Sequence, residues 1–204
     1  MVYLYNLLGK AKCTLIYGAG GVGKTTLALE AALVNSMKNK TAIYAFSGPY
    51  SFINRALEIC RALGEDKMPA TLTLAKTDSF KSLMDLTELI LLKPPSIVVV
   101  DTVTYAYRTA ISMGMRPMEA GRMLSQILGL LTSAKLENGL LLVADAQTKP
   151  DGIEHAVGES PLNYWCDEVV CIKRSPNGER VATINNDKEV KFSISSTGTE
   201  EALA

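Results

Sequence analysis

The sequence lacks the features that mark most zinc-binding and membrane-spanning chains. It has one histidine, His155, and four cysteines in 204 residues. No two cysteines form a Cys-x-x-Cys pair, so the ligand spacing of a zinc site is missing. No apolar run reaches the roughly 18 residues of a membrane helix. The apolar start at residues 3–8 lacks the basic region and the length of a signal peptide. We expect a soluble, cytoplasmic protein with reduced thiols and no membrane partner.

An excess of charge of either sign is also lacking. Lys and Arg together number 21, and Asp and Glu together number 21. Binding of nucleic acid by bulk positive charge is therefore excluded, and any such contact needs a local patch. The apolar fraction of 48% excludes a disordered chain. A chain of this length buries enough surface to fold as one unit, and we predict a single domain over residues 1–204.

The hydrophobic pattern alternates between short apolar runs and helical spacing, and then changes. Residues 24–38 are predicted to form a helix with one apolar face, and residues 97–100 a strand buried on both faces. The other expected strands are 14–17, 41–46, 72–74 and 140–144, and the other expected helices are 53–63, 79–93 and 117–131. Three short strands at 168–173, 180–184 and 190–194 follow, with a turn at Pro176-Asn177-Gly178. The pattern predicts an α/β fold: a mainly parallel central sheet flanked by helices, with a C-terminal antiparallel hairpin extension.

One glycine-rich segment carries the strongest chemical signal. It follows a predicted strand, precedes a predicted helix and fits G-x-x-x-x-G-K-[ST]. Glycines let backbone amides wrap around a polyphosphate, and the helix start adds a positive dipole end. Lys24 would reach the β- and γ-phosphates, and the Thr25 hydroxyl would bind Mg²⁺. We assign ATP binding to Gly18, Ala19, Gly20, Gly21, Val22, Gly23, Lys24, Thr25 and Thr26.

Two polar residues follow other apolar strands. Asp101 ends the run at 97–100, which is the form of a Walker B motif, and it would hold Mg²⁺ together with Thr25. The alternative is an aspartate that caps the next turn. Gln147 follows the strand at 140–144 and would sense the γ-phosphate, unless it is an ordinary surface glutamine. We therefore name Lys24, Asp101 and Gln147 as the candidate catalytic residues.

The order of these parts resembles the RecA/RadA family of recombinases, and most closely its small archaeal RadB-like paralogs. The resemblance covers essentially the whole chain. It depends on Gly18 to Thr25, on Val98-Val99-Val100-Asp101-Thr102-Val103-Thr104 with Arg108 after it, on Leu142-Val143-Ala144-Asp145-Ala146-Gln147, and on the hairpin from Val169 to Ile184. It implies a RecA-like P-loop NTPase core with ATP at the strand ends.

The departures from the family pattern concern hydrolysis and assembly. The family's catalytic glutamate follows the second strand, but Ser47 stands at or near that position and no other acid is expected nearby. Because serine is a poor base for activating water, we expect a weak or partner-dependent ATPase. The family's Gly-Gly-His is replaced by Gly158-Glu159-Ser160, and the segment that covers a neighbour's ATP is reduced to residues 185–188. An N-terminal helical domain and a polymerisation linker are not expected either.

The resemblance also implies two DNA-facing loops, at about residues 110–117 and 148–161. Arg108, Arg116 and Lys149 are the candidate DNA contacts, with Arg122 and His155 beside them. Cations on mobile loops suit phosphate contacts, and so few of them predict weak, salt-dependent binding of single-stranded DNA. A solvated loop or a methionine-packed helix edge is the alternative. We expect the aromatic pair Tyr164 and Trp165 to lie in the core or an interface.

Three functions remain open on the sequence. The first is an ATP-binding RecA/RadA paralog in homologous recombination and DNA repair, whose partners would be single-stranded DNA and the main RadA-type recombinase or other repair proteins. The second is a KaiC-like regulatory P-loop ATPase with a protein partner and no DNA contact. The third is a small-molecule kinase, although no Arg-x-x-Arg lid is recognisable.

Overall fold

The computed structural model describes residues 3–8, 11–150, 152–175 and 178–202. Its strands form a sheet in the order β10-β9-β8-β7-β1-β5-β4-β2-β3, and β6 pairs with β5 outside this path. The strands are β1 (Cys13–Gly18), β2 (Ala42–Phe46), β3 (Leu72–Lys76), β4 (Ile97–Asp101), β5 (Leu140–Thr148), β6 (Glu154–Ala156), β7 (Glu168–Arg174), β8 (Arg180–Ile184), β9 (Lys188–Ser195) and β10 (Gly198–Glu201). The helices are α1 (Tyr3–Leu7), α2 (Lys24–Met37), α3 (Phe52–Ala62), α4 (Phe80–Leu92), α5 (Val103–Ser112), α6 (Pro117–Ser133) and α7 (Glu159–Trp165).

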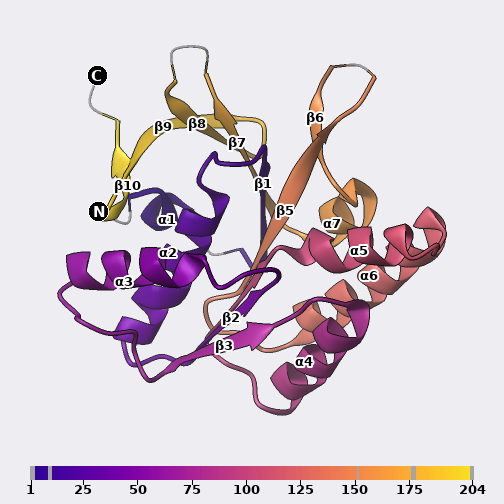
Figure 1. The fold of residues 1–204 in the computed structure, drawn as a ribbon, viewed down its shortest axis with the longest axis horizontal. Helices are drawn as coiled ribbons and strands as arrows, with labels where there is room; N and C mark the ends of the chain where they lie inside the picture. Colours follow the sequence, from indigo (N-terminus) through magenta and orange to yellow (C-terminus); the bar gives the residue numbers. More distant parts are fainter. Residues whose placement is uncertain (1–2, 9–10, 151, 176–177, 203–204) are drawn as a thin grey trace.

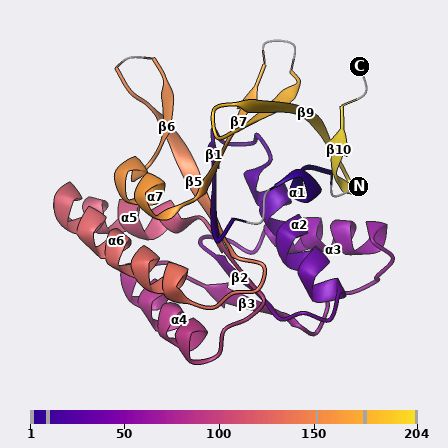
Figure 2. The same cartoon turned by 180° about the vertical axis from the view of Figure 1, so that it is seen from behind.

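The predicted fold class is confirmed by the pairing of the strands. The neighbouring strands β3, β2, β4, β5, β1 and β7 run parallel to one another. The strands β7, β8, β9 and β10 pair antiparallel in this order. The predicted turn at residues 176–178 joins β7 to β8, but residues 176–177 lie outside the described part of the chain. The β5–β6 and β7–β8 hairpins rise from the same edge of the sheet (Figures 1 and 2). In a parallel sheet this is the edge where strands end and ligands bind.

Helices cover both faces of the sheet, and each face has its own apolar core. The helices α1, α2 and α3 pack on one face, and α4, α5, α6 and α7 on the other (Figures 1 and 2). Strand β4 shows why, because Val99 points into the first core and Val98 and Val100 point into the second. A strand that is buried on both faces has no polar alternation, as the run at 97–100 predicted.

The helix boundaries follow ordinary capping chemistry. The Ser79 hydroxyl accepts a hydrogen bond from the Ser82 amide at 3.2 Å, and the Ser82 hydroxyl accepts one from the Ser79 amide, which makes a capping box for α4. Pro117 opens α6, where its missing amide hydrogen costs nothing. The backbone of Gly64, just after α3, has a φ of 94° that favours glycine. These are the boundaries that the sequence predicted.

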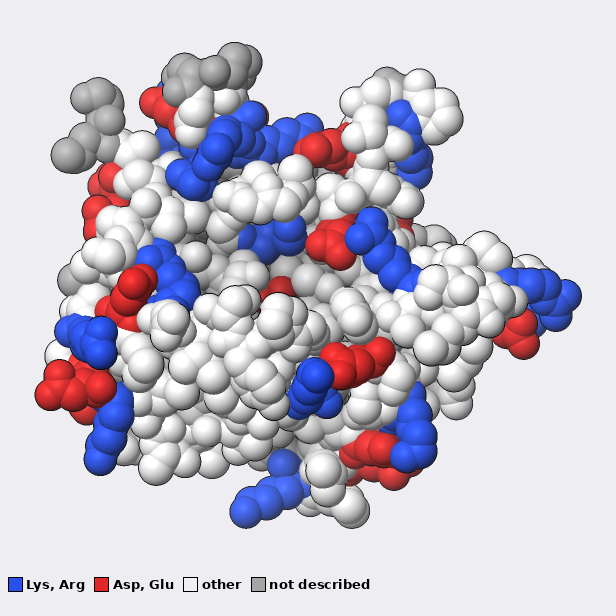
Figure 3. Space-filling view, in the orientation of Figure 1, with Lys and Arg blue, Asp and Glu red and all other residues white. Residues whose placement is uncertain are grey.

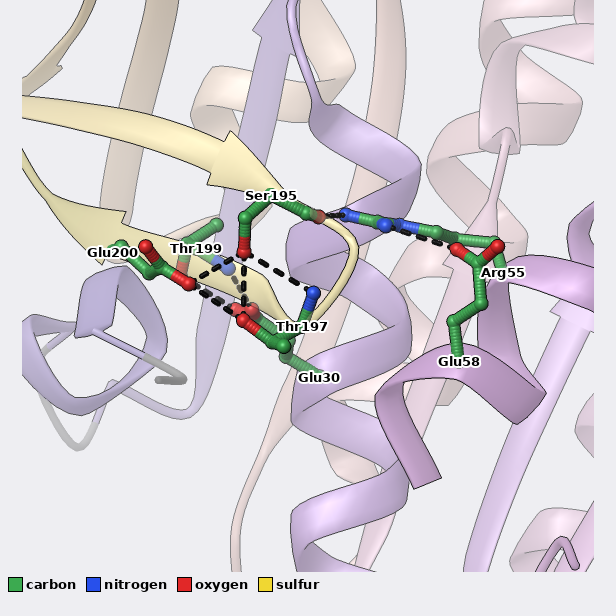
Figure 4. A network of polar contacts seen from close by, with 7 residues as sticks. All are labelled: Glu30, Arg55, Glu58, Ser195, Thr197, Thr199 and Glu200. Carbon is green, nitrogen blue, oxygen red and sulfur yellow. Dashed lines mark hydrogen bonds and ion pairs between the residues drawn. The ribbon is translucent and has the colours of Figure 1, made fainter. Parts of the chain in front are cut away.

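The helix α2 differs from its prediction, because it is buried on nearly all sides. The apolar Val34 and Met37 are only half-buried, while the polar Glu30 and Asn35 are fully or almost fully buried. The reason is that α2 lies between the sheet and a cover made of α1, α3 and β10. Figure 4 shows part of this cover, a polar network in which the Glu30 carboxylate accepts hydrogen bonds from Thr199 of β10.

The two predicted DNA-facing loops are shorter than expected. Residues 110–112 end α5, Pro117 begins α6, and only residues 113–116 link them. The second segment is largely the β5–β6 hairpin and the start of α7. The prediction did not include α1, α5, α7, β6 or β10. In the described part of the chain, every helix is too short or too polar to cross a membrane.

Candidate nucleotide-binding site

The glycine-rich loop joins β1 to α2, as predicted, and close contacts restrict its first and last glycines. A Cβ at Gly20 or Gly21 would meet no atom within 4 Å. A Cβ at Gly18 would lie 2.2 Å from the carbonyl oxygen of Ile172 on β7. A Cβ at Gly23 would lie 2.2 Å from Cδ1 of Ile194 on β9, and the Gly23 φ of 112° also disfavours a side chain. The loop is therefore enclosed by the C-terminal strands as well as by its own turn.

Lys24 opens α2 and lies at the centre of the site. Its side chain is buried, and Nζ donates hydrogen bonds to the carbonyl oxygens of Gly18 and Ala19, both at 2.9 Å. Burial lowers the pKa of Lys24, while the carboxylates of Asp145, Asp101 and Glu154 act in the opposite direction. The ammonium is thus held by its own loop among acidic groups.

Asp101 ends β4 and is brought next to the loop. Its Oδ2 accepts a hydrogen bond from the Tyr44 hydroxyl at 2.7 Å, and the Thr25 side chain also interacts with its carboxylate. Burial raises the pKa of Asp101, and these two side-chain interactions and the charge of Lys24 oppose that rise. The peptide bond that follows Asp101 is cis.

Thr25 and Asp101 together form a donor set that fits Mg²⁺. They supply one hydroxyl and one carboxylate, which are hard oxygen ligands, and Mg²⁺ commonly takes one or two protein ligands with water and phosphate oxygens. Among the residues that the structure describes, no cluster of three or more His, Cys, Asp or Glu side chains could hold a metal ion. The site therefore suits a magnesium ion that arrives with a phosphate group, and not an all-protein metal centre.

Ser47 lies directly after β2, beside the end of β4. Its amide donates to the carbonyl oxygen of Asp101 at 2.9 Å, and its hydroxyl accepts from the Thr102 amide at 3.1 Å. The expectation that no acid lies nearby was wrong, because the Asp78 carboxylate accepts a hydrogen bond from the Gly48 amide at 3.4 Å. Asp78 follows β3, the neighbour of β2, so the parallel pairing of these strands brings it there.

Gln147 and Asp145 both lie near the end of β5, but they have different surroundings. Asp145 is in register with Gly18, whereas Gln147 lies two residues further along, exposed and paired with His155 of β6. Asp145 contacts α5 through the Thr104 hydroxyl at 3.4 Å and Arg108 at 3.3 Å. Asp145 was not predicted as a site residue. Its position one step past the apolar run of β5 was the available signal.

The three candidate DNA contacts each have an acidic partner in the described structure. Arg108 pairs with Asp145, Arg116 pairs with Glu119 at 3.5 Å, and Lys149 pairs with Glu159. The Arg108 and Arg116 side chains are more than half exposed, and exposed ion pairs cost little to open. The Lys149–Glu159 pair is partly buried.

A groove of about 610 Å³ lies between the end of β5, α6 and α7, and Gln147, Arg122 and Tyr164 are among its lining residues. Trp165 is half-buried and donates to the Ser125 hydroxyl at 2.9 Å. The Tyr164 side chain is 78% exposed at the groove, so it lies outside the core of this chain.

The sheet order, the phosphate loop and the paired Asp101 define a RecA-like P-loop core. No family model matches the chain. Curated relatives named DNA repair and recombination protein RadB occur in Methanococcus maripaludis. The strain C5 protein is 25% identical over 81% of this chain and 78% of its own length, and the strain C7 protein is 24% identical over 89% and 85%. A crystal structure of the RadB recombinase matches with a TM-score of 0.72 at 21% identity, over 94% of this chain and 90% of that one. The chain is similar to RadB proteins in sequence and in fold.

Proposed function

We propose that this protein is an ATP-binding RecA/RadA paralog that acts in homologous recombination and DNA repair or modulates them. The curated relatives carry recombination and repair in their names. The observation that carries the proposal is the meeting of Lys24, Thr25 and Asp101 at the phosphate loop, whose first and last glycines lie against the C-terminal strands. This arrangement suits a nucleoside triphosphate with Mg²⁺.

The residues of this chain would divide the work of binding. The loop amides and Lys24 would bind the phosphates, for which Lys24 would exchange its carbonyl partners for phosphate oxygens. Thr25 and Asp101 would hold Mg²⁺, which neutralises phosphate charge when bound. Tyr44 keeps the Asp101 carboxylate in place by its hydrogen bond.

The nucleotide would act mainly as a switch, with slow hydrolysis. Ser47 lacks the basicity to activate water, and the neighbouring Asp78 carboxylate is held by Lys76 at 3.0 Å, so turnover would depend on a partner or on an assembly. Asp145 would couple the phosphate loop to α5, which carries the predicted DNA contact Arg108. Its carboxylate interacts with the charge of Lys24 and contacts Thr104 and Arg108 of α5. A change at the phosphate loop would therefore alter the position of α5.

Calorimetry with Mg-ATP tests the nucleotide step. We expect heat of binding for the natural protein and none for Lys24→Ala, with Lys81→Ala as a control because Lys81 is an exposed lysine on α4 that pairs with Asp85. Absence of heat from the natural protein with both ATP and GTP would overturn the proposal.

Single-stranded DNA binding is tested by fluorescence anisotropy at low and physiological salt. We expect weak binding that falls steeply with salt. Binding that does not change with salt would contradict a phosphate contact through Arg108, Arg116 and Lys149.

A KaiC-like regulatory ATPase without DNA contact is the second candidate function. It is favoured by the acidic partners of Arg108, Arg116 and Lys149, because each partner offsets the charge that DNA would need. A protein that binds ATP, shows no DNA binding at low salt and retains a protein partner in a pull-down would support this function instead.

A further inference from the structure

Three cations lie just past the phosphate loop on the neighbouring strands. Gly18 pairs in register with Ile172 of β7, so the next two residues of β7, Lys173 and Arg174, lie beside the loop. Arg180 opens β8 directly opposite Arg174. Figure 3 shows Lys and Arg side chains gathered over β7 and β8, next to a hollow that faces the β5–β6 hairpin.

A cavity of about 480 Å³ connects this cluster with the phosphate loop. Lys173 and Arg174 line the cavity together with Ala19, Gly20 and Val22 of the loop. The facing wall comes from the β5–β6 hairpin and includes one acid, Glu154, besides Thr148 and Gly152. The charged residues that line the cavity are thus two cations and one anion, and Arg180 adds a third positive charge beside Arg174.

Arg174 and Arg180 lie on the sheet face that carries α2. Side chains alternate along a strand, and Ile172 and Ala182, two residues from each arginine, belong to the core on the α2 side. Because the loop leads into α2, the two guanidinium groups share the side of the sheet on which the loop turns.

The two arginines have like charge and no acidic partner in the structure's described part. Burial lowers the pKa of Arg180, and the neighbouring charge of Arg174 lowers it further. The Nε of Arg180 is buried, and no hydrogen-bond partner for it is found among the described residues. Like charges opposite one another on paired strands destabilise a sheet, so an anion between them would relieve a cost that the fold otherwise bears.

We propose that Arg174 and Arg180, assisted by Lys173, form a second phosphate-binding element that acts with the phosphate loop of the same chain. The ligand is the phosphate tail of a nucleoside triphosphate, so the inference rests on the proposed nucleotide binding and adds residues that the loop motif does not contain. Guanidinium forks match phosphate oxygens in geometry and charge, and the loop amides complete an anion site on the other side of the cavity.

The test compares Arg174→Gln/Arg180→Gln with the natural protein by calorimetry, using Mg-ATP and magnesium tripolyphosphate as separate probes. We expect the affinity of the double variant for both probes to fall about tenfold or more. Tripolyphosphate lacks the nucleoside, so a loss of affinity for both probes would show that the arginines bind the phosphate groups. A loss for ATP alone would overturn that assignment.

Lys191→Gln is the matched control. Lys191 lies on β9 in the same antiparallel extension, is largely exposed and pairs with Glu179 at 3.2 Å. We expect its affinity for both probes to stay within about twofold of the natural value, since its charge is already offset. Circular dichroism melting of each variant separates a loss of binding from a loss of folding, and Arg174→Lys/Arg180→Lys should recover part of the affinity because it restores the charge.

The outcomes distinguish this inference from the proposed function. If the double variant binds both probes like the natural protein while Lys24→Ala does not bind, the arginine element is wrong and nucleotide binding stands. If the double variant keeps its ATP affinity but loses single-stranded DNA, the cluster belongs to nucleic acid and the inference is overturned. If the natural protein binds neither probe, both proposals fail.

Discussion

Replacing Glu30 with glutamine should make the protein's stability less sensitive to a rise in pH from 5 to 8. Glu30 lies in α2, its side chain is fully buried, and its carboxylate accepts hydrogen bonds from the Thr199 amide and from the Thr199 hydroxyl, the latter at 2.8 Å (Figure 4). Burial raises the pKa of Glu30, and the Thr199 hydrogen bonds and the charge of Arg55 oppose that rise without cancelling it.

The direction follows from proton linkage. A carboxyl group whose pKa is raised on folding contributes most to stability below its unfolded pKa, and this contribution is lost as the pH rises towards the folded pKa. The loss cannot exceed about 1.4 kcal/mol per pH unit for one proton. Glu30→Gln has no such proton, so its free energy of unfolding should rise relative to the natural protein between pH 5 and pH 8. Glu30→Ala instead leaves the Thr199 amide without an acceptor and opens a cavity, which should cost about 2–4 kcal/mol.

Urea unfolding of the natural protein and the variants at pH 5, 6, 7 and 8 provides the measurement. Glu58→Gln is the control, because Glu58 belongs to the same network but is 47% exposed in its ion pair with Arg55. Its difference from the natural protein should stay within about 1 kcal/mol at every pH. A difference between Glu30→Gln and the natural protein that is constant from pH 5 to pH 8 would refute the reasoning.

Three further predictions concern the loop, the hydrolytic position and the thiols. Gly23→Ala should lower the free energy of unfolding in urea by more than about 1 kcal/mol, because the position has a positive φ and its Cβ would contact Ile194. Adding Ile194→Ala to this variant should recover only the part of the loss that comes from the contact. Ser47→Glu should raise ATP turnover in a phosphate-release assay if the position faces the γ-phosphate, and unchanged turnover would show that it does not. The hydrogen bond with Cys166 and burial raise the pKa of the Cys13 thiol. Iodoacetamide at pH 8 should therefore label Cys13 only after unfolding, as read by peptide mass mapping; rapid labelling of the native protein would contradict this.

The parts of the site that the sequence predicts are those that depend on neighbours in the chain. The phosphate loop is a local motif between a strand and a helix, and its eight residues contain both the glycines and the lysine. Asp101 was predictable because a carboxylate at the end of an uninterrupted apolar strand lies at a known edge of the sheet.

The unpredicted parts depend on contacts between distant segments. The role of Asp145 requires the register of β5 with β1, and the proximity of Asp78 requires the pairing of β2 with β3. The burial of Glu30 requires a cover that includes Thr199, 169 residues away in the chain. Helical periodicity cannot detect a second packing partner, so a helix that is buried all round does not match the one-sided pattern.

The position of β1 in the sheet has a consequence for biosynthesis. Its two neighbours, β5 and β7, begin at Leu140 and Glu168, so the strand that leads into the phosphate loop has no partner until most of the polypeptide has left the ribosome. Non-local pairing of this kind slows folding, and unpaired strand edges invite association in the meantime. A nascent chain that stops before β7 would carry the whole glycine motif and yet lack the walls that shape it.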